Sequence, residues 1–424
     1  MLAYLITGIA WLVWMILSFL LARWLSLKGM DVWILRGVLF FLGTLAAGFA
    51  AFWIYRRKKA AEGVVSESAE GSQEIDLLVH EAVRRLRGSK LGAGASLGKL
   101  PVMFLLGETG SVKTTTIARS GLDPELLSGR AYQDTSVVPT EAANIWYTRN
   151  AVFVDCAGAL ADDPGRWTRL VRHMRPGRIS SAVSKSQQAP RAAIICYPCE
   201  NFFQGGASQA ATISAKKLNA RLQELSRLLS ISFPVYVLFT KFDRVPFFAE
   251  YAQTLTKEEV SEVLGTTVPL RAAQTGVYAE EETKRLTKAF DELFYSLAER
   301  RLDVLARETQ SEHLPGIYEF PREMRKMRSL LVDFLVNLAR PSQLQSNPFL
   351  RGFYFTGVRA VMVDDAAPVA REVAAEAAAD AGATRIFSAG QLRGAPAAQP
   401  AYVARSRKVP QWVFLTHLFN DVIL

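Results

Sequence analysis

Two long stretches near the start of the chain consist almost entirely of apolar residues. Residues 2–22 carry no charge, and residues 32–55 carry only Arg36, close to the beginning of that stretch. A helix of about 20 residues crosses a hydrocarbon core of roughly 30 Å. The pattern therefore predicts a transmembrane hairpin within residues 1–59, with spans over 2–22 and 32–55.

Beyond this hairpin the hydrophobic pattern changes to that of a globular protein. Residues 60–98 indicate a polar linker followed by an amphipathic helix, and short apolar runs then alternate with segments of helical periodicity. The runs of strand length are 100–107, 144–149, 151–158, 192–199, 234–241 and 351–358, and the helical segments are 114–120, 209–231, 257–264, 281–307 and 321–339. Buried strands that alternate with helices predict an α/β fold with a doubly wound parallel sheet.

The same pattern divides the remaining chain into consecutive parts. We expect a nucleotide-binding type of core over 99–250, a helical subdomain over 251–345 and a final core strand over 346–358. Residues 359–411 are rich in alanine and predict a linker. Residues 412–424 turn apolar again, which we interpret as a segment that leads toward a third span outside this sequence.

Charge and cysteine content fix the expected compartment. The formal net charge is +10, and four of the positive charges form the run 56–59 directly after the second apolar stretch. Such a run is typical of a cytoplasmic membrane edge, so it does not indicate a nucleic-acid partner. Three cysteines exclude a disulfide framework. We therefore expect a multi-pass membrane protein with its large domain in the cytoplasm.

A phosphate-binding loop follows the strand predicted at 100–107. It matches the P-loop pattern GxxxxGK[ST] at every position but one, because a valine replaces the second glycine. Its backbone N–H groups would surround a β-phosphate, its lysine would reach the β- and γ-phosphates, and its last threonine would bind Mg²⁺. The residues of the loop are Gly107, Glu108, Thr109, Gly110, Ser111, Val112, Lys113 and Thr114.

Two further strand ends carry residues that suit the same ligand. Asp155 and Gly158 end the strand at 151–158, where the carboxylate would hold Mg²⁺ through water and the glycine N–H would contact a γ-phosphate. Thr240, Lys241 and Asp243 end the strand at 234–241 and match the guanine-reading pattern [NT]KxD. The three motifs in order predict a site for Mg²⁺ with GTP or GDP, and ATP is the alternative nucleotide.

Two threonines and an alanine refine this hypothesis. Thr140 lies a short way before Asp155 in the chain and is a candidate switch threonine that closes on Mg²⁺, although an ordinary loop threonine fits the pattern almost as well. Thr356 would reach the base-binding edge of the sheet. Ala159 stands where many GTPases carry the glutamine that orients water, so we expect slow hydrolysis at most. The pattern leaves open a free-standing membrane-anchored regulatory GTPase and a scaffold that binds no nucleotide.

The chain resembles the TssM/IcmF family of type VI secretion inner-membrane proteins. The resemblance combines two N-terminal spans with the P-loop and with motifs that are not general GTPase features, such as YEFPREM and RGFYFTGV. The stretches that carry it are 107–116, 151–158, 218–243, 318–324, 351–358 and 414–424, together with Trp167 and the Arg-Pro pair at 175–176.

This resemblance, and no feature of composition or spacing, implies a role in secretion. It implies a structural subunit of a membrane complex whose GTPase-like domain acts as a switch or a scaffold. It further implies contact with a TssL-like inner-membrane protein and, through a periplasmic region outside this sequence, with a TssJ-like outer-membrane lipoprotein. Baseplate components and further copies of the same chain complete the expected partners.

Overall fold

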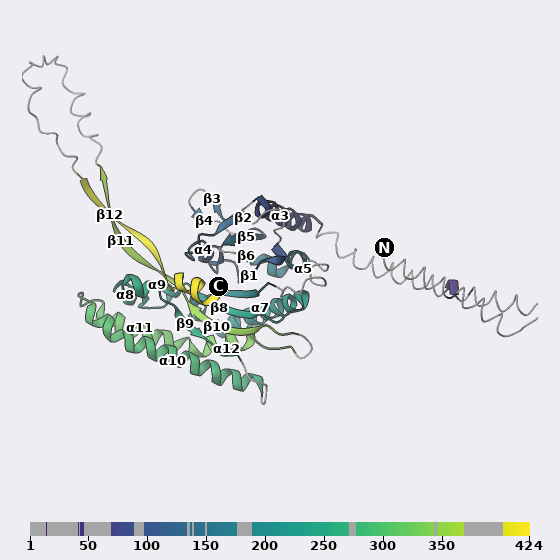
Figure 1. Ribbon diagram of the computed structural model, residues 1–424. Coiled ribbons are helices and arrows are strands. Elements are labelled where there is room, and N and C mark those ends of the chain that lie inside the picture. Colours follow the sequence, from purple (N-terminus) through teal and green to yellow (C-terminus); the bar gives the residue numbers. More distant parts are fainter. Residues whose placement is uncertain are drawn as a thin grey trace, which may run out of the picture. The chain divides into compact units, whose positions relative to one another are not determined.

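The computed structural model describes most of the chain beyond residue 68 (Figure 1). The described residues are 14, 41, 43–45, 69–88, 97–133, 136–137, 140–148, 151–175, 189–270, 277–342, 346–368 and 402–424. The chain divides into two units, Met1–Leu77 and Leu78–Leu424, and the second contains every strand that the structure describes. The spans expected over 2–22 and 32–55 lie almost wholly outside the described residues. Of the helices that the structure does describe, none has the length and apolar character required to cross a bilayer.

An eight-stranded sheet forms the centre of the second unit. Its strands are β1 (Val102–Leu106), β2 (Glu125–Ser128), β5 (Ala143–Thr148), β6 (Ala151–Cys156), β7 (Arg191–Pro198), β8 (Pro234–Thr240), β9 (Leu264–Thr267) and β10 (Phe349–Phe355), in the order β2-β5-β6-β1-β7-β8-β10-β9. The five strands from β6 to β10 run parallel, and β5, β2 and β9 are antiparallel to their neighbours. The predicted α/β class with a large parallel sheet is confirmed.

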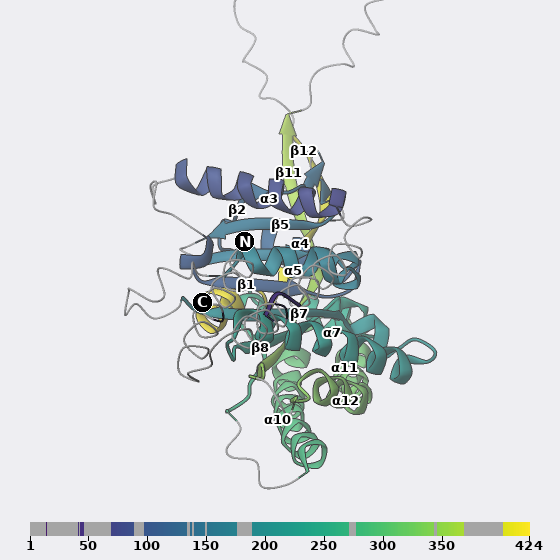
Figure 2. The same ribbon diagram turned by 90° about the vertical axis from the view of Figure 1, so that its right-hand side faces the viewer.

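Helices cover both faces of this sheet (Figures 1 and 2). On one face, Ile117 of α4 belongs to the same core cluster as Met103 and Leu105 of β1. On the opposite face, the ring of Phe104 meets Trp167 of α5, with ring centroids 6.5 Å apart. The helices are α3 (Ala69–Gly88), α4 (Lys113–Ala118), α5 (Pro164–His173), α7 (Ala207–Leu229), α8 (Phe248–Gln253), α9 (Lys257–Ser261), α10 (Tyr278–Arg307), α11 (Leu314–Lys326) and α12 (Arg328–Leu338).

The helical part expected over 251–345 is interrupted by a strand. β9 lies within that range and pairs with β10, so this part of the chain contributes to the main sheet. The single helix expected over 321–339 is instead two helices, α11 and α12, which meet at Met327. The expected helix over 281–307 lies within α10.

The linker expected over 359–411 is wrong at both of its ends. Strand β11 (Gly357–Pro368) pairs with β12 (Tyr402–Val413) along the full length of both strands, forming a two-stranded antiparallel ribbon. The ribbon projects from the sheet, as both views show (Figures 1 and 2). Alanine-rich sequence has low strand propensity, so the local pattern concealed a pairing between two segments that lie far apart in the chain. The rest of the predicted linker lies outside the described residues.

The apolar segment 412–424 packs against the core of the second unit, and the expectation that it leads toward a third span stays a prediction. Leu415, Leu418 and Phe419 are buried and join the core cluster on the α4 face of the sheet. The ring of Phe419 lies 5.9 Å from that of Phe153 in β6. A π-helical turn, η5 (Leu418–Ile423), contains two of these residues.

A buried arginine closes the amino-terminal edge of the sheet. Arg191, the first residue of β7, is only 4% exposed and donates to five backbone carbonyls. Their residues are Gly98, Leu100, Met174, Ala189 and Pro190. Burial lowers the pKa of Arg191 to about 10. Its guanidinium thereby satisfies acceptors from three separate segments where the strands begin.

Candidate functional site

The loop between β1 and α4 lies at the carboxyl end of the central strand, as the sequence predicts. Gly107 has φ 155°, and a Cβ there would lie 2.4 Å from the carbonyl oxygen of Cys196 and 2.7 Å from Ser111 Oγ. Gly110 adopts φ 79°, in the left-handed region. Both positions therefore require glycine, one for close approach and one for conformation.

Val112, at the position where the P-loop pattern has glycine, adopts the left-handed conformation. Its φ is 67° and its ψ is 20°, immediately before the first residue of α4. Its carbonyl accepts from the backbone N of Thr116 at 3.0 Å and from Thr116 Oγ1 at 2.8 Å, which holds the residue at the start of the helix. A β-branched residue in this region is strained by about 1–3 kcal/mol. The loop thus keeps its backbone shape at the cost of conformational strain.

The side chain of Lys113 folds back into the hollow of the loop. Its ammonium donates to the carbonyl oxygens of Gly107 at 2.9 Å and Glu108 at 2.8 Å, and to Ser111 Oγ at 3.2 Å. The residue is only 6% exposed. A positive charge therefore lies inside the loop, on the groups that line it, and a phosphate would have to draw it outward.

Four side chains from three segments meet beside this loop. Asp155 Oδ2 accepts from Thr114 Oγ1 at 2.6 Å, from Thr140 Oγ1 at 3.2 Å and from Asn144 Nδ2 at 3.2 Å. Thr114 and Thr140 also lie within hydrogen-bond distance of each other, at 3.1 Å. Burial raises the pKa of Asp155, while the hydrogen bond from Thr114 and the charge of Lys113 oppose this shift. The three residues expected around Mg²⁺ are thus brought together.

The second oxygen of Asp155 has no such partner. Its Oδ1 is buried and accepts no hydrogen bond in the described part of the chain. A buried carboxylate oxygen without a partner is costly, and a hard divalent cation would satisfy it. The same described residues contain no group of three or more His, Cys, Asp or Glu that could hold a metal alone. The oxygen atoms of Asp155 and Thr114 therefore fit as two ligands of a Mg²⁺ whose other ligands would include phosphate oxygens.

Gly158 brings the segment after β6 directly against the loop. A Cβ at this position would lie 2.5 Å from both N and Oγ1 of Thr109. The following turn, η2 (Ala159–Asp162), is held by α7, because Arg221 Nε donates to the carbonyl of Ala161 at 2.6 Å. The segment that would sense a γ-phosphate is thereby fixed against both the loop and a long helix.

The predicted base-reading residues lie at the end of β8. Thr240 is buried and donates from Oγ1 to the carbonyl of Ser111 at 3.1 Å, which connects this strand to the loop. Lys241 Nζ forms an ion pair with Glu200 at 2.6 Å. Asp243 Oδ1 accepts from the backbone N of Val358 at 3.1 Å. The lysine and the aspartate of the motif therefore each have a partner within the protein, one on η3 (Cys199–Phe202) and one on β11.

Three residues of this region were missed by the sequence analysis. Asn144 lies on β5, where it binds Thr140 and Asp155, and its place inside a strand gave no signal. Glu200 pairs with Lys241, and Ser214 of α7 donates to Glu108 at 2.6 Å.

The CxxC thiols of Cys196 and Cys199 are fully buried, and burial raises the pKa of each well above its ordinary range.

Comparisons with known proteins agree on one family. The family model described as the IcmF-related N-terminal domain matches residues 166–424. The type VI secretion system component TssM1 of Pseudomonas aeruginosa is 31% identical over 307 residues, which are 70% of this chain and 26% of that protein. The chain therefore spans about a quarter of the length of that relative.

Among the solved structures that match the chain is the signal recognition particle receptor SRb-GTP/SRX complex from Chaetomium thermophilum, 15% identical, with a TM-score of 0.21. The match covers 34% of this chain and 70% of that one. A TM-score of 0.21 is too low to say anything about the site or its ligand.

Proposed function

Because the chain belongs to the family of the IcmF-related N-terminal domain, we propose that it is a structural subunit of a type VI secretion membrane complex. In this proposal the segment 1–59 anchors it in a bacterial inner membrane and the α/β unit lies in the cytoplasm. A TssL-like inner-membrane protein is the proposed partner within the membrane. A TssJ-like outer-membrane lipoprotein is the proposed partner beyond it. The similarity to TssM1 supports this role.

We further propose that the α/β unit is a P-loop domain that binds guanine nucleotide with Mg²⁺. The arrangement of Thr114, Thr140 and Asp155 beside the loop carries this proposal, because it leaves one buried carboxylate oxygen to be satisfied. Mg²⁺ would supply charge neutralisation for the β- and γ-phosphates. Lys113 would exchange its loop carbonyls for phosphate oxygens.

The protein's own residues favour a switch over a fast enzyme. Asn144 holds both Thr140 and Asp155 by hydrogen bonds, so it would keep the candidate switch threonine close to the metal. The methyl side chain of Ala159 has no polar group that could orient an attacking water. Slow turnover would keep the bound state occupied for long periods, which suits a structural subunit.

One observation favours a second candidate, a scaffold that binds no nucleotide. The ammonium of Lys113 already has three acceptors inside the loop, and the carbonyl of Val112 accepts two hydrogen bonds from Thr116. A loop stabilised in this way can persist as a structural corner between β1 and α4. Binding measurements separate the two candidates.

The test is titration of a fluorescent GDP analogue with Mg²⁺ into the full chain in a mild detergent. We expect micromolar binding that Lys113→Ala abolishes and that Lys284→Ala, on α10, leaves unchanged. Unlabelled GTP should compete and ATP should compete poorly. Binding that is absent up to millimolar nucleotide, or equal in Lys113→Ala, would refute the nucleotide site and leave the scaffold.

A second variant tests the choice of base. Asp243→Asn replaces an acceptor with an amide that can donate, so it should weaken GDP and favour XDP, whose xanthine carries a carbonyl in place of the 2-amino group. A reversal of preference between these two nucleotides would assign the base to Asp243. Equal weakening of both would indicate that Asp243 only shapes the site.

A further inference from the structure

The root of the β11–β12 ribbon lies against Asp243, a residue of the candidate base site. The backbone N of Val358 donates to Asp243 Oδ1 at 3.1 Å, and a Cβ on Gly357 would lie 2.8 Å from the backbone N of Asp243. Thr356, the residue before the ribbon, accepts from Phe242 N at 3.0 Å and donates from Oγ1 to the carbonyl of Val413 in β12 at 2.8 Å. Asp243 is therefore oriented by the ribbon.

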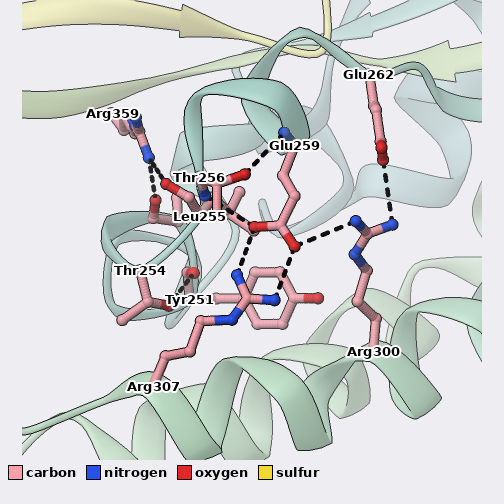
Figure 3. Close-up of polar contacts among 10 residues, drawn as sticks. Tyr251, Thr254, Leu255, Thr256, Glu259, Glu262, Arg300, Arg307 and Arg359 are labelled. Atoms are coloured by element: carbon pink, nitrogen blue, oxygen red, sulfur yellow. Dashed lines mark hydrogen bonds and ion pairs between the residues drawn. The ribbon is translucent and has the colours of Figure 1, made fainter.

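An arginine fixes the next residue of the ribbon to the helical part of the chain. Arg359 donates to the carbonyl oxygen of Leu255 at 2.6 Å (Figure 3). It also donates to the carbonyl oxygen of Ala252 at 3.1 Å. The same guanidinium donates to Gln411 Oε1 across the ribbon at 2.8 Å. The side chain of Arg359 thus connects both strands of the ribbon to the end of α8 and to the turn that follows it.

The helix after that turn, α9, is held to α10 by a carboxylate that lies between two arginines. Glu259 of α9 accepts from Arg307 at 2.8 Å and 3.0 Å and from Arg300 at 3.1 Å, both on α10 (Figure 3). Glu259 and Thr256 also form a reciprocal capping box at the start of α9. The ribbon, the turn and α10 therefore form a continuous set of charge-assisted contacts that ends at Asp243.

We propose that the ribbon is a regulatory arm of the nucleotide site, in which its position controls how tightly the guanine base is held. The inference rests on the proposed guanine-nucleotide binding. Val358 of the ribbon is hydrogen-bonded to Asp243, so a displacement of the ribbon would displace the base-reading carboxylate. Coupling of this kind is reciprocal, so bound nucleotide equally stabilises the ribbon.

The test uses the full chain and two arginine variants. We measure release of the fluorescent GDP analogue after addition of excess unlabelled GDP, in wild type, Arg359→Ala and Arg322→Ala. Arg322 is an exposed arginine of α11 whose ion pair with Glu319 lies away from the ribbon contacts, and it serves as the matched control. We expect release about tenfold faster in Arg359→Ala, and unchanged within about twofold in Arg322→Ala, because only the first removes the donor that ties the ribbon root to the carbonyls of Ala252 and Leu255.

A measurement on the unaltered protein complements the variants. Hydrogen exchange of peptides covering 402–412 in β12 should slow when GDP binds, while exchange in α12 stays constant. Unchanged exchange in β12, in a sample that binds GDP, overturns the regulatory arm and leaves the nucleotide site standing. A wild-type chain that binds no GDP overturns both proposals. If Arg359→Ala fails to fold, the exchange result alone decides.

Discussion

Val112→Gly is the substitution whose outcome depends most directly on the backbone of the loop. Val112 is half-buried and has a φ of 67°. Replacing a half-buried valine by glycine removes about 1 kcal/mol of apolar burial. It also adds about 0.4–1 kcal/mol of unfolded-chain entropy. At an ordinary position the two losses together reach about 2 kcal/mol.

At position 112 a third contribution opposes these losses. Glycine removes about 2 kcal/mol of strain that a β-branched residue meets in the left-handed region. The expected change in the free energy of unfolding is therefore within about 1 kcal/mol of zero. The variant should also bind nucleotide at least as tightly as wild type, because an isopropyl group no longer projects from the loop.

The assay is thermal and chemical unfolding of Val112→Gly beside a matched control, Val263→Gly. Val263 is also half-buried, and its φ is not positive. We expect the control to lose about 2 kcal/mol, the sum of lost burial and added chain entropy, and Val112→Gly to lose little or nothing. Equal losses in the two variants would refute the strain at Val112.

Three further substitutions test buried charges. Asp155→Asn should stabilise the ligand-free protein at pH 7.5, because burial raises the pKa of Asp155. The contribution of Asp155 to the free energy of unfolding is fully present below its ordinary pKa of 3.8 and is lost as the pH rises through its raised pKa in the folded protein. The Tm of Asp155→Asn should therefore exceed that of wild type by less as the pH falls toward 4. Glu259→Gln should cost about 1–3 kcal/mol, since the hydrogen bond from Arg307 lowers the pKa of Glu259 to about 2; this gap in unfolding free energy should be present above pH 4.5 and close as the pH falls toward 2. Arg191→Met should cost about 3 kcal/mol or more in chemical unfolding, and a loss below about 1 kcal/mol would show that water satisfies the five carbonyls.

The parts of the fold that were predictable from the sequence are those with short-range causes. The strand ending at Leu106 and the helix beginning at Lys113 follow from an apolar run, a glycine-rich turn and a polar–apolar periodicity within about 20 residues. The meeting of Thr114 with Asp155 also follows, because carboxyl ends of neighbouring parallel strands share one edge.

The parts that were missed depend on contacts between distant segments. Asn144 lies in an antiparallel strand, and only its pairing opposite Asp155 in the sheet brings its amide to that carboxylate. The ribbon was missed because its partners, such as Gly357 and Val413, are separated by a long stretch of weak strand propensity. That Val112 keeps a glycine's conformation is likewise decided by the surrounding loop and not by its own preference.

The burial of the segment after β12 has a consequence for how the chain is made. Phe153 and Phe419 touch in the finished core, yet more than half of the chain separates them. At roughly 5–20 residues per second on the ribosome, one face of the sheet stays uncovered for roughly 13–53 s after β6 emerges. Contacts between segments this far apart in the chain also slow folding itself. The nascent chain therefore presents an open apolar surface until the turn at Leu418–Ile423 docks, and that surface is exposed to aggregation for the same period.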